Sequence, residues 1–222
     1  MRASPTMYKS SREKAYFLIK EAIVMHKYKP GQFLNEIHLA KELSLSRTPI
    51  REALHALEAE GFLTLLPNRG AQVAAITKKD VEELFELRLL FEGLAGEKLV
   101  TQKNYACLDL MEKMLDKQRE CCQNNDLVRF VEYDRKFHLT LIRAAENEKM
   151  YKIYDELRDH LLRLGLQAIQ STELMHVAYT DHIALLKALR NGALEEYHNI
   201  IVDHLSKTRN AVAQIIPNLL YS

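Results

Sequence analysis

Leu45-Ser-Arg-Thr-Pro-Ile-Arg-Glu-Ala-Leu54 is the stretch that decides the fold of this 222-residue chain. Ser46 is a good helix N-cap residue, and we expect its hydroxyl to accept a hydrogen bond from the backbone N–H of Thr48. Pro49 then falls in the first turn, where its missing N–H costs little. Apolar residues follow at helical spacing, at positions 50, 53, 54 and 57. The pattern predicts an amphipathic helix from about Arg47 to Glu60 whose apolar face packs inward.

The polar face of this helix has the chemistry of a DNA-reading surface. Thr48, Arg51, Glu52 and His55 point away from the apolar face, and Arg47 lies at the exposed N-terminal end. A helix N-terminus favours phosphate, and an arginine can bind a guanine edge through two hydrogen bonds. We therefore expect this end of the helix to enter a major groove, although an ordinary solvated face explains the helix chemistry equally well.

The flanking segments predict two helices before this one and a β-ribbon after it. The helices are expected at about residues 11–27, ending before Pro30–Gly31, and at about 36–43. Strands are expected at 62–66 and 71–75, joined by a turn in which Gly70 can adopt a positive φ. At the tip of that turn, Arg69 is placed to reach the DNA backbone or the minor groove. Three helices followed by a two-stranded ribbon is the order of a winged helix-turn-helix.

The remainder of the chain predicts an all-α bundle. After Gly70 it has four glycines and one proline, and its apolar residues recur at helical spacing. About six helices are expected, at roughly 78–100, 103–122, 126–147, 149–169, 173–190 and 193–215. Thr77-Lys-Lys-Asp80 resembles a capping box with Asp in the usual place of Glu or Gln. The chain is therefore predicted to be mainly α, with a domain at 1–77 and a helical domain at 78–222.

Composition and charge exclude several classes of protein. No apolar run approaches the roughly 18 residues of a membrane span, and the first residues lack the apolar stretch of a secretory signal. The three cysteines do not make a disulfide framework, so we expect reduced thiols in a cytoplasmic protein. Residues 1–77 carry 11 Lys and Arg against 7 Asp and Glu, a net charge of +4, whereas the rest carries 20 against 23, a net charge of −3. This small asymmetry favours contact of the first domain with phosphate.

Two pairs of polar residues in the helical domain indicate a buried site. Asp134 and His138 lie four residues apart, so both project from one helical face beside apolar neighbours. His182 and His204 lie on the last two predicted helices, and an antiparallel hairpin that turns at Asn191–Gly192 brings them level. One carboxylate and three imidazoles suit a divalent transition metal such as Zn, Ni or Mn. A hydrogen-bonded polar core is the alternative.

The first domain resembles the GntR family of bacterial regulators over residues 15–77. The resemblance is carried by Pro30-Gly-Gln-Phe-Leu-Asn-Glu36, by the 45–54 stretch, by Leu57-Glu-Ala-Glu-Gly61 and by Pro67-Asn-Arg-Gly-Ala-Gln-Val73. It implies that Ser46, Arg47, Thr48 and Arg51 approach bases and phosphates, and that Arg69 and Gly70 form the wing tip. Some family members carry a DNA-contacting arginine near Ile37, so a different operator preference is expected here.

The helical domain resembles the FCD effector-binding domain of the FadR subfamily. The motifs are Asp80-x-x-x-Leu-Phe-Glu-Leu-Arg88-x-x-x-Glu92, Asp134-x-x-Phe-His138, the Asp-His182 pair and Asp203-His204. In that family an Asp-x-x-x-His pair and two later histidines coordinate a metal, which implies Asp134, His138, His182 and His204 as ligands. The family's effectors are often small carboxylates that complete the metal's coordination. Arg88 could hold such a carboxylate or form an i,i+4 ion pair with Glu92.

Together these features predict a DNA-binding transcription regulator rather than an enzyme. We expect a homodimer that places two recognition helices on a pseudo-palindromic double-stranded operator. A small organic acid bound near the metal is expected to change operator affinity. Two other classes remain open. One is a metal-dependent hydrolase, for which no general base beside the ligands is evident; the other is a DNA-binding protein with no ligand.

Overall fold

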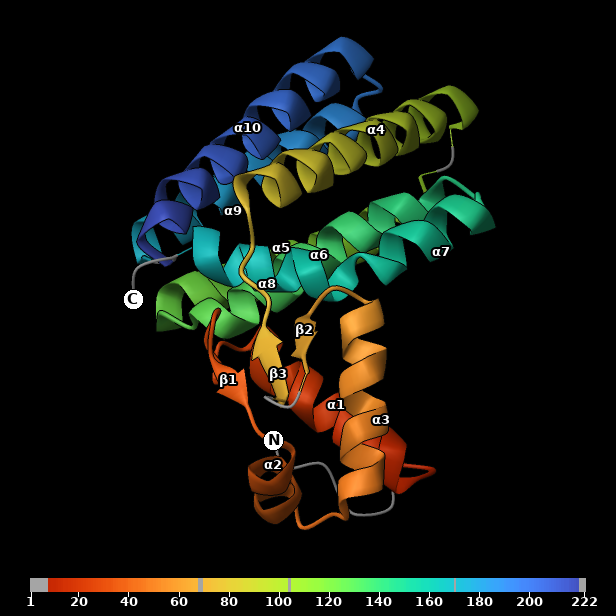
Figure 1. Ribbon diagram of the computed structural model, residues 1–222. Coiled ribbons are helices and arrows are strands. Elements are labelled where there is room, and N and C mark those ends of the chain that lie inside the picture. Colours follow the sequence, from red (N-terminus) through yellow and green to blue (C-terminus); the bar gives the residue numbers. More distant parts are fainter. Residues whose placement is uncertain (1–7, 68–69, 104, 170, 220–222) are drawn as a thin grey trace. The chain divides into compact units, whose positions relative to one another are not determined.

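The computed structural model describes residues 8–67, 70–103, 105–169 and 171–219, and the chain is mainly α-helical (Figure 1). It divides into two compact units. The first unit ends at Ile76 and the second comprises Thr77–Pro217. None of the helices in the described ranges is long and apolar enough to cross a membrane.

The first unit has the three helices predicted from the sequence. Its elements, in chain order, are α1 (Ser11–Val24), β1 (Phe33–Leu34), α2 (Glu36–Leu43), α3 (Arg47–Ala59), β2 (Leu63–Leu66) and β3 (Gly70–Val73). Helix α1 packs against α3, and the two contribute buried apolar residues that include Ile19, Ile23, Leu54 and Leu57. The winged helix-turn-helix order is therefore present.

The two predicted strands of the wing are present as the antiparallel pair β2 and β3, and a third short strand that was not predicted, β1, extends the sheet in the order β1-β3-β2. Strand β1 pairs with β3 through Phe33↔Gln72 and Leu34↔Ala71. A two-residue strand shows no alternation, so its sequence gives no strand signal. Gly70 permits the pairing. Its φ is +89°, and a Cβ there would lie 2.5 Å from the backbone oxygen of Leu34.

The second unit is a helical bundle. In the part of the chain that is described, its helices are α4 (Lys78–Gln102), α5 (Leu108–Asn124), α6 (Leu127–Ala144), α7 (Glu148–Glu156), α8 (Arg158–Ala168), α9 (Thr172–Arg190) and α10 (Leu194–Leu219). The predicted helix at 149–169 is thus two helices, α7 and α8. The helix is interrupted at Leu157, which is the C-cap of α7 and the N-cap of α8 and keeps helical angles (φ −77°, ψ −8°). Neither glycine nor proline marks that break, so the sequence does not reveal it.

Helix α6 lies at the centre of this unit. It contacts α4, α5, α7, α8 and α9, and α5 also packs against α9. Helix α4 begins with the predicted capping box: the N–H of Asp80 donates to the Thr77 hydroxyl at 3.1 Å, and the N–H of Thr77 donates to the Asp80 carboxylate at 2.7 Å.

Helices α4 and α10 approach closely at Gly96. A Cβ at Gly96 would lie 2.2 Å from Cε1 of Tyr197, a residue of α10 that is fully buried. The Tyr197 hydroxyl donates to the backbone oxygen of Glu92 at 2.8 Å. The absence of a side chain at Gly96 therefore makes room for an aromatic ring that ties the two helices together.

Candidate nucleic-acid interface and candidate metal centre

The N-terminal end of α3 presents the predicted DNA-binding residues to solvent. Ser46, Arg47, Thr48 and Arg51 are all exposed, whereas Pro49 and Ile50 are buried. Gly70 begins β3, in the same unit. Arg69, the predicted wing-tip residue, lies outside the described residues.

Ser46 is the N-cap of α3, but its side chain makes no capping hydrogen bond, so the predicted bond to the N–H of Thr48 was wrong. Most N-cap side chains of this chain bind the third helical residue: Ser10 accepts from Glu13, and Thr77 accepts from Asp80. In α3 the third helical position is Pro49, which has no N–H to donate. The Ser46 hydroxyl is therefore left available for another partner.

Glu36, in the first turn of α2, links Arg47 and Arg51, the two arginines predicted to contact DNA. Its carboxylate receives two hydrogen bonds from Arg51, at 3.0 and 2.9 Å, and one from Arg47, at 3.2 Å. The Arg51 hydrogen bonds hold the pKa of Glu36 below its usual range, so the group stays charged. A concave surface lined by Asn35, Ile37, Leu65 and Pro67 adjoins these charges. Glu36 was not predicted as a site residue, because it meets Arg47 and Arg51 only across 11 and 15 residues of the chain.

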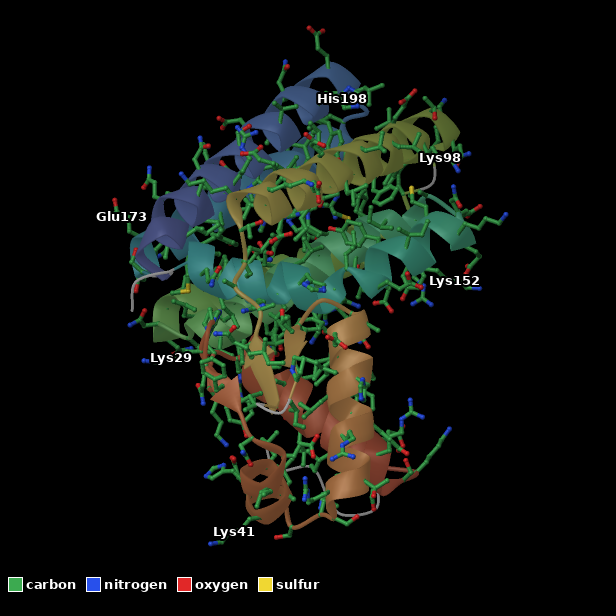
Figure 2. The ribbon with its side chains drawn as sticks, in the orientation of Figure 1. Lys29, Lys41, Lys98, Lys152, Glu173 and His198 are labelled. Atoms are coloured by element: carbon green, nitrogen blue, oxygen red, sulfur yellow. The ribbon has the colours of Figure 1, made fainter. Side chains whose placement is uncertain are left out.

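In the second unit, the four predicted metal ligands come together from three helices. Asp134 and His138 lie on α6, His182 on α9 and His204 on α10. Each offers one ligand atom, and these atoms all lie within 4.8 Å of one another. The three imidazoles are almost fully buried, with exposed fractions of 1%, 0% and 3%. His198, which is also on α10 (Figure 2), is half-buried and does not belong to this cluster.

Each of the three buried imidazoles has an oxygen beside its Nδ1 atom. His182 Nδ1 lies 2.8 Å from Oε1 of Gln118, and His204 Nδ1 lies 3.3 Å from Oδ2 of Asp181. His138 Nδ1 lies 2.8 Å from Oε2 of Glu92, and these two atoms have no other partner among the described residues. Oxygen acceptors at Nδ1 fix the proton there and leave Nε2 as the lone-pair nitrogen.

The Nε2 atoms of His138 and His182 face each other at 3.2 Å. Oδ1 of Asp134 lies 3.3 Å from Nε2 of His182 and 3.9 Å from Nε2 of His138. Two nitrogens bound to one tetrahedral zinc at about 2.0–2.1 Å would be roughly 3.3 Å apart. Two opposed lone pairs repel unless a cation lies between them, so this donor set fits a divalent metal.

The electrostatics of the cluster favour the neutral form of His182 and His204, which is the metal-binding form of an imidazole. Burial lowers the pKa of His182 well below its usual 6.5, and the neighbouring His204 and His138 lower it further. Burial also lowers the pKa of His204, although its hydrogen bond with Asp181 opposes the shift.

Arg88 makes the predicted ion pair with Glu92 and also lines a cavity at the cluster. Its Nε donates to Oε1 of Glu92 at 2.8 Å, and the Tyr154 hydroxyl donates to the same oxygen at 2.7 Å. Burial raises the pKa of Glu92, but Arg88 and His138 outweigh this and hold it well below its usual range. Arg88, Asp134, His138 and His204 share the cavity wall with apolar residues that include Phe85 and Leu164. Arg88 can therefore pair with Glu92 and still face a carboxylate in the cavity, so the two predicted roles of Arg88 are compatible.

Three residues that support the histidines were not identified from the sequence in that role. Glu92 and Asp181 lie in the motifs that carry the FCD resemblance, so a signal was present for them. Gln118 lies on α5, 64 residues from His182, and nothing in its surroundings in the sequence distinguishes it.

Comparisons with known proteins identify both units. The family model of the FCD domain matches residues 83–207, and the model of bacterial regulatory proteins, gntR family, matches residues 11–73. An uncharacterized HTH-type transcriptional regulator, YdhC, of Bacillus subtilis is 30% identical over 67% of this chain and 68% of its own length. The Nta operon transcriptional regulator of Aminobacter aminovorans is 27% identical over 87% of this chain and 90% of its own length.

Solved structures share the fold. A GntR regulator from Rhodococcus sp. RHA1 matches with a TM-score of 0.75 at 21% identity, covering 93% of this chain and 97% of its own. McbR/YncC of E. coli matches with a TM-score of 0.72 at 21% identity, covering 93% of this chain and 99% of its own. The chain therefore belongs to the GntR family of bacterial regulatory proteins, as a DNA-binding transcription regulator with an FCD effector-binding domain.

Proposed function

We propose that this regulator binds a small carboxylate at a divalent transition metal held by Asp134, His138, His182 and His204, and that the carboxylate changes its affinity for DNA. Zn, Ni and Mn are the metals that the donor set suits. The observation that carries the proposal is the convergence of buried imidazole Nε2 atoms whose Nδ1 atoms all face oxygen.

In this proposal the metal is an anchor for the effector and not a catalyst. When bound, it supplies a positive charge that attracts a carboxylate oxygen. Glu92, Gln118 and Asp181 orient the three imidazoles, and Arg88 offers its remaining guanidinium nitrogens to the effector from the cavity wall. The rival reading as a hydrolase predicts that the effector is converted, so recovery of unchanged organic acid after incubation with the metal-loaded protein tests it.

On DNA, the N-terminal end of α3 is proposed to enter the major groove. Arg47 and Arg51 are assigned to bases and phosphates, Ser46 and Thr48 to phosphate oxygens, and Arg69 and Gly70 to the wing contact with the backbone or minor groove. A cytoplasmic homodimer would place two such helices on a pseudo-palindromic operator. Leu90 and Leu94 of α4 are exposed in the single chain and offer apolar area for dimer contacts in the helical unit.

Linkage connects the two sites. An effector that prefers one arrangement of the dimer changes operator affinity by as much as its affinities for the two arrangements differ. A coupling of about 1–3 kcal/mol, which is common for such systems, changes operator affinity roughly 5- to 150-fold.

Metal analysis and a thermal-shift screen test the metal and the effector together. We expect one divalent ion per chain, and a melting temperature that small organic acids raise and EDTA lowers. His182→Ala and His204→Ala are expected to lose the ion, whereas the control His198→Ala, on α10 but outside the four-residue cluster, keeps it. Full metal content in both His182→Ala and His204→Ala would contradict the site, and a melting temperature insensitive to EDTA would identify a polar core.

Arg51→Ala tests the DNA face. We expect weaker operator binding and an unchanged fold, and a salt dependence that is shallower by about one unit of log–log slope if a phosphate contact is lost. Lys41→Ala, an exposed change on α2, serves as the control for a general loss of positive charge. Operator affinity equal to that of the unaltered protein would remove Arg51 from the interface.

A further inference from the structure

Ile37 is an exposed apolar side chain beside the charged groups of the recognition surface. It lies in the first turn of α2, directly after Glu36, and 62% of it is exposed. Together with Glu36, Arg47 and Arg51 it lines the concave surface at the N-terminal end of α3. Helix α2 packs into the core of its unit through Leu39, which is buried. The packing of α2 therefore does not require an apolar residue at position 37.

The backbone of α2 holds Ile37 in a defined place. Oδ1 of Asn35 accepts hydrogen bonds from the N–H of Ile37 at 2.8 Å and from the N–H of His38 at 3.3 Å, and so caps the helix. Isoleucine is branched at Cβ, so its χ1 has one strongly preferred rotamer in a helix. Little conformational freedom is then lost when the side chain meets a ligand, and an apolar group fixed in this way can recognise a partner of defined shape.

The neighbouring arginine reads a different kind of group. Nε and Nη2 of Arg51 both donate to Glu36, at 3.0 and 2.9 Å, so the guanidinium is held beside the first turn of α2. Its remaining N–H groups can donate to guanine, whose N7 and O6 atoms are acceptors in the major groove. Thymine presents a C5 methyl group there, which is the apolar feature of the major-groove base edges. An exposed isoleucine next to the arginine is the complementary surface for that methyl group.

We propose that Ile37 recognises the 5-methyl group of a thymine in each half of the operator. This inference rests on the proposed entry of the N-terminal end of α3 into the major groove, and it adds the base that is selected and the residue that selects it. Contact of Ile37 with deoxyribose would not depend on the base and is a distinct outcome of the test.

Replacement of thymine by deoxyuridine in an operator duplex measures the contribution of the methyl group. Binding sites are first selected from a random double-stranded library with the full-length protein. Each thymine is then changed to deoxyuridine in both half-sites, which keeps the base pair and its hydrogen-bonding groups and removes only the methyl. Burial of a group of this size corresponds to about fourfold in affinity, so the loss at the contacted position should be about fifteenfold for two half-sites. At the same position, 5-methylcytosine should bind more tightly than cytosine by a similar factor.

Variants then assign the methyl preference to Ile37. Ile37→Ala is expected to reduce the ratio of thymine to deoxyuridine affinity at that position to about one. Phe33→Ala is the matched control, because Phe33 is 58% exposed in β1 of the same unit but is not among the described residues that line the concave surface. It should keep the full ratio. Each ratio compares two duplexes on one protein, so a general loss of stability cancels from it.

Two results would overturn the inference. One is a duplex in which no thymine methyl contributes to binding by the unaltered protein. The other is a methyl ratio that survives in Ile37→Ala, or an Ile37→Ala variant that loses affinity equally for every duplex, as a sugar contact predicts.

Arg51→Ala separates this inference from the proposed interface. Weaker operator binding by Arg51→Ala, with methyl ratios that Ile37→Ala leaves unchanged, would reject the role of Ile37 and leave the α3 interface standing. Unchanged operator binding by Arg51→Ala, with no contribution from any thymine methyl, would reject both.

Discussion

Gly96→Ala is expected to destabilise the helical unit, although alanine is the better helix former. A methyl group at Gly96 would lie 2.2 Å from Cε1 and 2.4 Å from Cζ of Tyr197, well inside carbon–carbon contact distance. The ring must therefore move. Moving it costs about 1–3 kcal/mol as overpacking, and roughly 0.5–1.5 kcal/mol more if its hydroxyl loses the backbone oxygen of Glu92. The higher helix propensity of alanine offsets about 1 kcal/mol of this loss in the free energy of unfolding.

Gly93→Ala is the control on the same helix, because a Cβ at Gly93 meets nothing within 4 Å. It gains the helix propensity alone and should stabilise the unit by about 0.5–1 kcal/mol. The difference between the two variants is then about 1–3 kcal/mol if the Tyr197 hydrogen bond survives and about 1.5–4.5 kcal/mol if it is lost, because the propensity gain that both variants share cancels.

Urea unfolding followed by circular dichroism at 222 nm measures both variants. A double-mutant cycle with Tyr197→Leu tests whether the clash with the ring causes the loss of stability. The destabilisation by Gly96→Ala should largely disappear when the ring is absent. Equal free energies of unfolding for Gly96→Ala and Gly93→Ala, or an undiminished cost in the Tyr197→Leu background, would refute the steric argument.

Three further changes separate the roles of individual side chains. Gln118→Leu removes the oxygen at Nδ1 of His182 and is expected to lower zinc affinity about tenfold to a hundredfold; an unchanged affinity in a chelator competition titration would contradict this. Glu36→Gln removes the carboxylate that Arg51 binds twice, so operator affinity should fall relative to nonspecific DNA, by about tenfold, while nonspecific binding strengthens as a negative charge is lost. A constant ratio in binding titrations would show that Glu36 does not position the arginine. Ser46→Ala should weaken operator binding but change the free energy of unfolding by less than about 0.5 kcal/mol, and a loss of about 1 kcal/mol would mean that the hydroxyl caps α3.

The local parts of the structure were predictable because their signals are local. The spacing of the apolar residues in the 45–54 stretch predicts a helix, and the same residues form the buried face of α3. Asp134 and His138 share a face because they are four residues apart. His182 and His204 meet because one glycine-containing turn joins two long antiparallel helices, and their ring centroids lie 4.7 Å apart.

The remaining features depend on contacts that no short stretch contains. Gln118 meets His182 across 64 residues, and Glu36 meets Arg51 across 15. Strand β1 exists because Gly70 lets its backbone approach Leu34, and β1 itself is too short to show a pattern. The capping bond predicted from the Thr48 N–H to Ser46 is absent. Pro49 explains only why the third helical position offers no donor in its place.

Helix α4 has the mechanical layout of a lever. Gly96 and Tyr197 clamp it to α10, so a tilt of α4 would pivot at this contact. Arg88, on the cavity wall, is roughly 12 Å along the helix axis from Gly96, and Lys78 is roughly 27 Å away, at 1.5 Å per residue. A tilt about the clamp is therefore amplified about twofold between Arg88 and the start of the helix. A displacement of ~1 Å at Arg88 would thus become ~2 Å at Lys78, and the capping box of Thr77 and Asp80 stabilises the first turn of α4 against fraying.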